Sequence, residues 1–114
     1  MIDFKGQVGA VGDGRNETDA LDALLKRCAA TGEDGWIPAG RYLIDPLTHV
    51  LGADVRVRCS PGATFAYHQR DKGTKALLTL RSNRRFGFEW YGGTFDPRDG
   101  VFVRAEASNT GLSF

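Results

Sequence analysis

The chain has 114 residues, of which 41% are hydrophobic and 25% are charged, and its formal net charge is +1. This length allows one domain with a modest core, while the near-zero charge excludes the strong field that nucleic acid or anionic membrane binding needs. No stretch has the apolar length that a bilayer-spanning helix requires. Fifteen glycines and four prolines indicate many turns, which favours short strands over long helices.

Residues 1–15 are expected to form an N-terminal loop, because they combine several glycines with polar residues and lack the pattern of a signal peptide. Residues 16–31 are predicted to form a helix whose first N–H groups Asn16 caps and which Gly32 ends. The helix carries one apolar stripe, formed by Leu21, Leu24, Leu25 and Cys28. Because a helix of this length is marginal alone in water, it must pack on a core.

Residues 33–114 alternate between short apolar runs and turn residues, which predicts one short strand after another. In the segment 86–91 the alternation places Trp90 in the core and Tyr91 outside. One set of strands begins near positions 55, 77 and 101, and a second set is centred on Phe65, Phe88 and Leu112, so that both advance with nearly the same period. Such a period is typical of parallel strands that stack turn upon turn, with a small antiparallel sandwich as the alternative.

The two cysteines, Cys28 and Cys59, have no metal-ligand spacing and each lies in an apolar pattern. We expect buried free thiols, with a disulfide as the alternative. The sequence predicts neither a metal site nor a cofactor.

Three segments resemble signatures of one family. Residues 9–14 (GAVGDG), followed by 17–21 (ETDAL), resemble the opening signature of the pectate-lyase-like superfamily. Residues 36–44 (WIPAGRYLI) and 92–96 (GGTFD) are similar to its next strand-and-turn landmarks.

The resemblance implies a fold and a domain organisation. The fold would be mainly β, a right-handed parallel β-helix of about three coils whose N-terminal mouth is closed by the amphipathic helix. The chain would be a single domain, 1–114, whose coils over 33–114 are incomplete at the C-terminal end. A solenoid that stops in an apolar strand exposes that edge, so either the natural protein continues or another chain covers it.

Asp96 and Asp99 are the weak candidates for a catalytic pair of carboxylates, which glycoside hydrolysis requires on either side of the scissile bond. Because they flank Pro97 and Arg98 and precede a glycine, a turn is the favoured interpretation. No catalytic constellation is predicted within the chain.

Arg84, Arg85 and Tyr91 are the candidate substrate-binding residues. Arginines can hold uronate carboxylates in a bidentate manner, and an exposed aromatic ring can stack on a sugar. The alternatives are a solvated corner for the arginines and packing against a neighbour for Tyr91.

Two functions follow from the resemblance. The first is a structural and adhesive module of a phage or phage-like spike that binds, or supports binding to, cell-surface polysaccharide. This module would be a homotrimer at the surface of a virion or extracellular particle. The alternative is the capped N-terminal end of a secreted polysaccharide lyase, glycoside hydrolase or epimerase whose catalytic coils lie beyond residue 114. Neither function involves nucleic acid or membrane insertion.

Overall fold

The computed structural model describes residues 1–45, 47–50, 53–67, 76–81, 87–95, 101–105 and 111–113. This part of the chain is mainly strands in parallel sheets, with one helix. The helix is α1 (Thr18–Thr31), and the strands are β1 (Ile2–Asp3), β2 (Asp13–Asn16), β3 (Gly35–Ile37), β4 (Gly40–Ile44), β5 (Leu47–Val50), β6 (Val55–Cys59), β7 (Ala63–Tyr67), β8 (Ala76–Arg81), β9 (Gly87–Tyr91), β10 (Thr94–Phe95), β11 (Val101–Ala105) and β12 (Gly111–Ser113).

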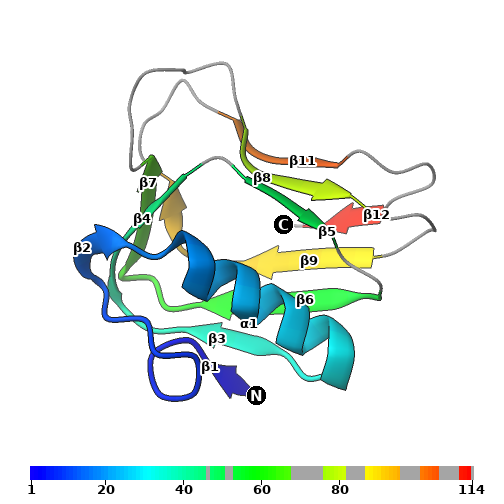
Figure 1. Ribbon diagram of the computed structural model, residues 1–114, viewed down its shortest axis with the longest axis horizontal. Coiled ribbons are helices and arrows are strands. Elements are labelled where there is room, and N and C mark those ends of the chain that lie inside the picture. Colours follow the sequence, from blue (N-terminus) through cyan, green and yellow to red (C-terminus); the bar gives the residue numbers. More distant parts are fainter. Residues whose placement is uncertain are drawn as a thin grey trace.

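The strands form three sheets, shown in Figure 1. Sheet A has the order β1-β3-β6-β9-β12, sheet B the order β10-β7-β4-β2, and sheet C the order β11-β8-β5. Every pairing between these described strands is parallel, so the antiparallel sandwich is wrong. After α1 the chain enters sheets A, B and C in this order, and then repeats it. Before α1 it enters A and then B, and α1 follows in place of a strand of sheet C.

The expected period holds for some pairs of strands but not for others. Gly35 pairs with Val57, and Leu78 pairs with Val103, and both of these steps along the chain are close to the expected one. Val57, however, pairs with Trp90, a clearly longer step. The expected stacking of position 55 under 77 and of Phe65 under Phe88 is therefore wrong, because the members of each pair lie in different sheets. Positions 77 and 101 do share sheet C, and Phe88 and Leu112 share sheet A.

The prediction of one constant period fails because the number of residues between paired strands changes along the chain. All three long steps after α1 (β5 to β8, β6 to β9, and β7 to β10) include the segment 68–75, which lies between β7 and β8. A segment between two strands lengthens one round of the chain without disturbing the backbone pairing on either side. A search for one constant period cannot allow for such a segment.

The helix packs through the predicted stripe. Leu21, Leu24, Leu25 and Cys28 are each 0% exposed, and α1 contacts β1, β3, β5 and β6. Figure 1 shows it lying across the strands of sheet A. Burial of each leucine contributes about 1.5–3 kcal/mol, which stabilises a helix that is marginal in isolation. As predicted, Gly32 ends it in the left-handed conformation (φ 75°) and donates its N–H to the Cys28 carbonyl.

The start of the helix differs from the expectation. Asn16 belongs to β2, and α1 begins at Thr18 with Glu17 as the flanking residue. The Asn16 side-chain oxygen nevertheless accepts hydrogen bonds from the Thr18 backbone N–H (3.0 Å) and from the Thr18 hydroxyl (2.5 Å). Asn16 thus satisfies an N–H of the first turn, from one position farther out than predicted.

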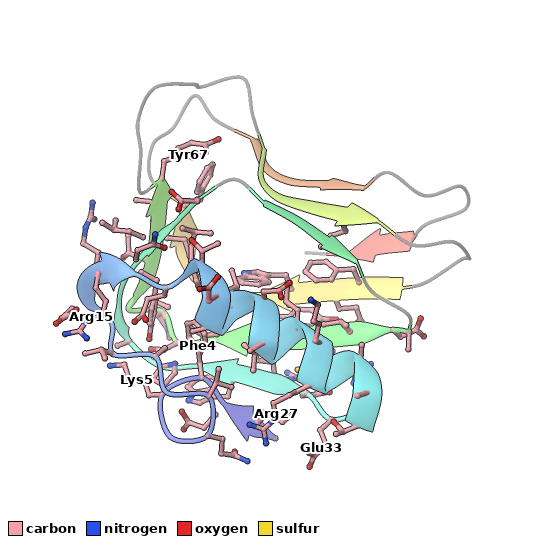
Figure 2. All side chains as sticks on the ribbon, in the orientation of Figure 1. Phe4, Lys5, Arg15, Arg27, Glu33 and Tyr67 are labelled. Carbon is pink, nitrogen blue, oxygen red and sulfur yellow. The ribbon has the colours of Figure 1, made fainter. Side chains whose placement is uncertain are left out.

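The expectation of a simple loop over 1–15 is wrong, because this segment contains β1 and β2, which pair with β3 and β4. Their partners are distant in the sequence, so local composition gives no sign of them. Glu17 fixes the end of the stretch between β1 and β2. This residue is 6% exposed, and its Oε2 accepts hydrogen bonds from the backbone N–H groups of Val11 (2.6 Å) and Gly12 (2.9 Å). Arg27 of α1, which Figure 2 shows beside the N-terminal segment, adds a hydrogen bond to the Gln7 carbonyl (3.0 Å).

A row of aromatic rings runs through the core between the sheets. Phe4 contacts Tyr42 with ring centroids 5.1 Å apart, Tyr42 contacts Phe65 at 5.5 Å, and Phe65 contacts Trp90 at 5.3 Å. The Tyr42 hydroxyl donates to the Pro38 carbonyl (2.7 Å), so this buried side chain keeps a hydrogen-bond acceptor. The row joins the N-terminal segment to sheets A and B.

The cysteines are buried free thiols, as predicted. Burial raises the pKa of Cys28 to about 11 and that of Cys59 to about 12. Both thiols are therefore protonated and unreactive at neutral pH.

Candidate functional site

Strands β6 and β9 have two unlike faces. In β6, Val55, Val57 and Cys59 are buried, while the residues between them, Arg56 and Arg58, are exposed. In β9, the buried Phe88 and Trp90 likewise alternate with the partly exposed Glu89 and Tyr91. Because successive side chains of a strand point to opposite faces, the charged and polar groups of both strands lie on the outer face of sheet A.

The parallel register brings the outward side chains together in two rows. Trp36 is the partner of Arg58, and Arg58 is the partner of Tyr91, which makes the first row. In the second row, Arg56 is the partner of Glu89. Asp34, which precedes β3, joins this row through an ion pair with Arg56. We call these residues the outer patch, which consists of Asp34, Trp36, Arg56, Arg58, Glu89 and Tyr91.

Ion pairs hold the second row in place. Arg56 Nη2 lies 2.9 Å from Glu89 Oε2, and Arg56 Nη1 lies 3.7 Å from Asp34 Oδ1. Hydrogen bonds from Tyr91 and from Arg56 lower the pKa of Glu89, and the Glu89 carboxylate in turn raises the pKa of Arg56. Both groups are therefore charged at neutral pH, and each has its orientation restricted by the other.

The first row combines a cation with aromatic rings. The guanidinium carbon of Arg58 lies over the Tyr91 ring, 5.3 Å from its centroid, and Arg58 Nε donates to Asp34 Oδ2 (3.4 Å). The Tyr91 hydroxyl donates to Glu89 Oε1. Trp36 lies between the buried Gly35 and Ile37 and so faces outward, where it is partly exposed beside Arg58. The row thus presents two aromatic side chains on either side of a half-exposed arginine, whose side chain is 49% exposed.

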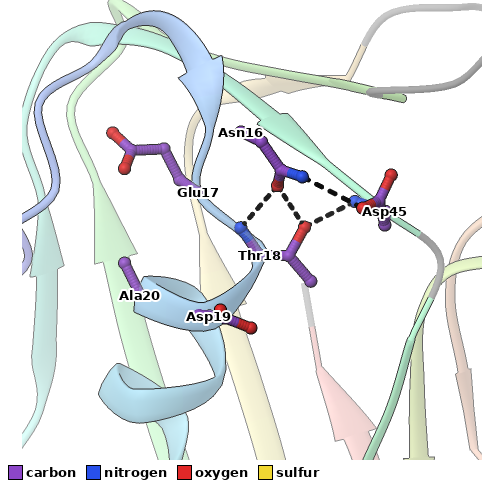
Figure 3. A pocket seen from close by; sticks show the side chains of 6 residues that line it. All are labelled: Asn16, Glu17, Thr18, Asp19, Ala20 and Asp45. Atoms are coloured by element: carbon purple, nitrogen blue, oxygen red, sulfur yellow. Dashed lines mark hydrogen bonds between the residues drawn. The ribbon is translucent and has the colours of Figure 1, made fainter.

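A second polar region lies at the start of α1, where a hollow of about 580 Å³ is lined by Asn16, Glu17, Thr18, Asp19, Ala20 and Asp45 (Figure 3). The Asn16 amide donates to Asp45 Oδ2 (3.0 Å), and the Asp45 backbone N–H donates to the Thr18 hydroxyl (2.8 Å). These bonds tie the start of the helix to the end of β4. We interpret this region as a structural junction, because Asn16, Thr18 and Asp45 are hydrogen-bonded to one another.

Of the residues predicted to bind or cut substrate, Tyr91 alone lies in the described part of the chain. It faces outward, as predicted, and it also packs against Arg58, so the two interpretations of this residue are compatible. The predicted residues Arg84, Arg85, Asp96 and Asp99 lie outside the described residues.

The other members of the outer patch were not predicted as site residues from the sequence. For Arg56 and Arg58, the sequence did contain a signal of an outward position, namely their alternation with two valines and a cysteine that are buried. Grouping these arginines with Trp36 and Tyr91 needs the register of β3, β6 and β9, and that register includes the long step from Val57 to Trp90.

Within the described segments, no group of three His, Cys, Asp or Glu side chains could hold a metal ion. The same segments contain no helix with the length and hydropathy needed to cross a membrane. Comparison with protein-family models, with curated proteins and with solved structures found no match for this chain. We therefore infer the function from the outer patch and from the resemblance of the sequence.

Proposed function

We propose that the chain forms the N-terminal part of a right-handed parallel β-helix of the pectate-lyase-like superfamily, closed at its first coil by α1. The cyclic order in which the chain enters sheets A, B and C supports this proposal, because a coil that closes on itself requires such an order. The position of α1, which follows β2 in place of a strand of sheet C, supports its role as a cap. Right-handedness is what parallel crossover connections adopt almost without exception.

We further propose that the protein is a structural and adhesive module that binds polysaccharide through the outer patch. The observation that carries this proposal is the row of Trp36, Arg58 and Tyr91 on the outer face of sheet A. A pyranose ring has an apolar face of C–H groups and a rim of hydroxyls. Aromatic rings suit the apolar face, while arginine donors and carboxylate acceptors suit the hydroxyls.

The geometry of the outer patch favours binding over a purely structural role. A hydrophobic side chain stabilises a fold by leaving water, yet Trp36 and Tyr91 remain partly exposed, whereas Phe88 and Trp90 are 0% and 3% exposed. The outer patch also lies mainly on three hydrogen-bonded strands, and ion pairs orient its arginines and carboxylates. A ligand therefore meets groups that are already ordered, which lowers the entropic cost of binding.

A glycan array screened with the whole chain, followed by calorimetric titration of the best ligand, tests this function. We expect Trp36→Ala and Tyr91→Ala each to lower affinity by about tenfold or more, which is the loss expected for a central aromatic contact. Arg41→Ala is the matched control, because Arg41 is exposed on sheet B, away from the outer patch, and its loss should leave the affinity unchanged. Absence of binding to any glycan would contradict the proposal.

The setting that we propose is a phage or phage-like spike, in which the chain would assemble as a homotrimer and meet cell-surface polysaccharide outside the cell. The resemblance to a superfamily that includes trimeric tailspikes supports this setting. Light scattering of the purified chain tests it, with the mass of three chains expected. A monomer that binds glycan at full affinity would contradict the trimer and leave the binding function intact.

A further inference from the structure

We propose that the outer patch selects a neutral glycan over an acidic one, and that the bound glycan runs across the strands, along the row from Trp36 to Tyr91. This inference rests on the proposed function and adds the class of ligand and its direction. Two independent observations carry it, namely the pairing of charges within the outer patch and the placement of its two aromatic side chains.

The charges of the outer patch cancel. Arg56 and Arg58 contribute two positive charges, and Asp34 and Glu89 contribute two negative ones. Each arginine is already paired, since Arg56 contacts both carboxylates and Arg58 contacts Asp34. There is thus no excess positive charge among these residues to attract the carboxylate of a uronate.

An acidic sugar would meet a specific penalty at this surface. To reach Arg56 or Arg58, its carboxylate must approach Asp34 or Glu89, which repel it, or displace one of them from an arginine. A neutral sugar meets no such competition. Its hydroxyls can donate to the carboxylate oxygens and accept from guanidinium N–H groups, and the hydrogen bond from Arg58 to Asp34 uses one of the five donors of that guanidinium.

The direction of the glycan follows from the register. Trp36 is in β3 and Tyr91 is in β9, with Arg58 of β6 between them as the partner of both. Neighbouring strands lie about 4.8 Å apart, so the two aromatic side chains start roughly 10 Å apart on a line perpendicular to the strands. A single sugar can cover only one of the two rings, whereas a chain that runs along this line can cover both.

The first test compares two sets of oligosaccharides of matched length, one neutral and one of uronates, by calorimetric titration of the whole chain at low and high salt. We expect the neutral set to bind about tenfold more tightly or better, to gain affinity from one sugar to longer chains, and to lose little of it in salt. Tighter binding of uronates, weakened by salt, would overturn the inference while leaving polysaccharide binding in place.

The second test changes the charge of the outer patch. Glu89→Gln leaves the patch with a net positive charge, so we expect the ratio of uronate affinity to neutral affinity to rise about threefold or more. Asp13→Asn is the matched control. It removes one negative charge outside the outer patch, from a carboxylate that pairs with Arg15, and the ratio of uronate to neutral affinity should not change. An equal rise in both variants would show a general effect of net charge and overturn the inference.

The outcomes separate this inference from the proposed function. If uronates bind more tightly than neutral glycans, and Trp36→Ala and Tyr91→Ala lower their affinity, the inference fails while the proposed function stands. If Trp36→Ala and Tyr91→Ala leave the affinity of the bound glycan unchanged, the ligand lies elsewhere and both fail. If no glycan binds, neutral or acidic, the proposed function itself fails.

Discussion

Val57 and Arg58 are neighbours in β6, yet Val57 is 0% exposed while the Arg58 side chain is 49% exposed. The same contrast holds in β9, between the buried Trp90 and the partly exposed Tyr91. The inner face of sheet A holds apolar side chains that exclude water, and its outer face holds paired charges and rings. Both faces belong to the same strands, so the contrast separates two kinds of residue. Those on the inner face are required for burial, and those on the outer face remain available for binding.

The inner face is under a strict physical constraint. Removing an apolar group there leaves a cavity that the surrounding chain fills only in part. The outer face is under no such constraint, because water solvates its groups before and after folding. Aromatic residues on the outer face are therefore informative about function, whereas those on the inner face are explained by packing.

The largest expected effect separates the two faces directly. We expect Trp90→Ala to lower the free energy of unfolding by about 3–5 kcal/mol, because the ring packs against Phe65 and Phe88 in the core. Tyr91→Ala, one residue later, should lower it by about 1 kcal/mol or less, since its contact with Arg58 is half exposed. Urea denaturation measures both. Equal losses would contradict the division of β9 into two faces.

A second effect concerns the turn that follows β9. Gly92 has φ 85°, and a Cβ there would lie 2.5 Å from the Cys59 carbonyl oxygen. We expect Gly92→Ala to lower the free energy of unfolding by about 1–3 kcal/mol. Gly87→Ala, at the start of the same strand, is the control, since its Cβ would meet Asp54 no closer than 3.6 Å. Denaturation of both variants should show the loss in Gly92→Ala alone.

Thiol reactivity also distinguishes buried positions from positions on the outer face. Cys59 is on the inner face of β6, and burial raises its pKa to about 12, as it raises that of Cys28 to about 11. We expect a disulfide reagent at pH 8 to leave both unmodified in the folded protein and to modify both in urea. In the variant Arg58→Cys, one additional thiol on the outer face should react at once.

The same pKa values set the response to alkali. Thiols ionise near pH 9 when unfolded, so the folded state, which holds its thiol protons, loses stability as the pH rises from 9 through 11 and 12. A flat stability profile across this range would contradict the burial of the thiols.

The smallest expected effect concerns the ion pair of the outer patch. Hydrogen bonds from Tyr91 and Arg56 lower the pKa of Glu89 from its ordinary value of 4.5. Its contribution to stability is therefore present above pH 4.5 and is lost as the pH falls through the lowered pKa of the folded state. Glu89→Gln should remove this part of the acid dependence and leave the rest. Thermal unfolding between pH 2 and 7 measures the difference.

Local patterns in the sequence predicted the elements whose cause is local. The stripe from Leu21 to Cys28, the stop at Gly32 and the alternation in Val55–Cys59 each follow from residues within one element. The pairing of β1 and β2 could not be predicted in this way, because their partners, β3 and β4, lie beyond the whole of α1 in the sequence.

The candidate site was harder to predict than the helix for the same reason. Tyr91 could be placed outside from the pattern of β9 alone. Its neighbours Arg58 and Trp36 follow only from a register whose step from β6 to β9 is longer than its step from β3 to β6. No single period connects these residues, so the outer patch becomes apparent only when the strands are paired.

Glycan binding to the outer face of sheet A can be followed at the two tryptophans of the chain. Trp36 lies in the outer patch and Trp90 on the inner face, so the indole N–H signals in a nitrogen-labelled sample report on one face each. When a neutral oligosaccharide is added, we predict that the Trp36 signal shifts in proportion to saturation while the Trp90 signal stays in place. A Trp36 signal that does not move at saturation would contradict glycan binding at the outer patch.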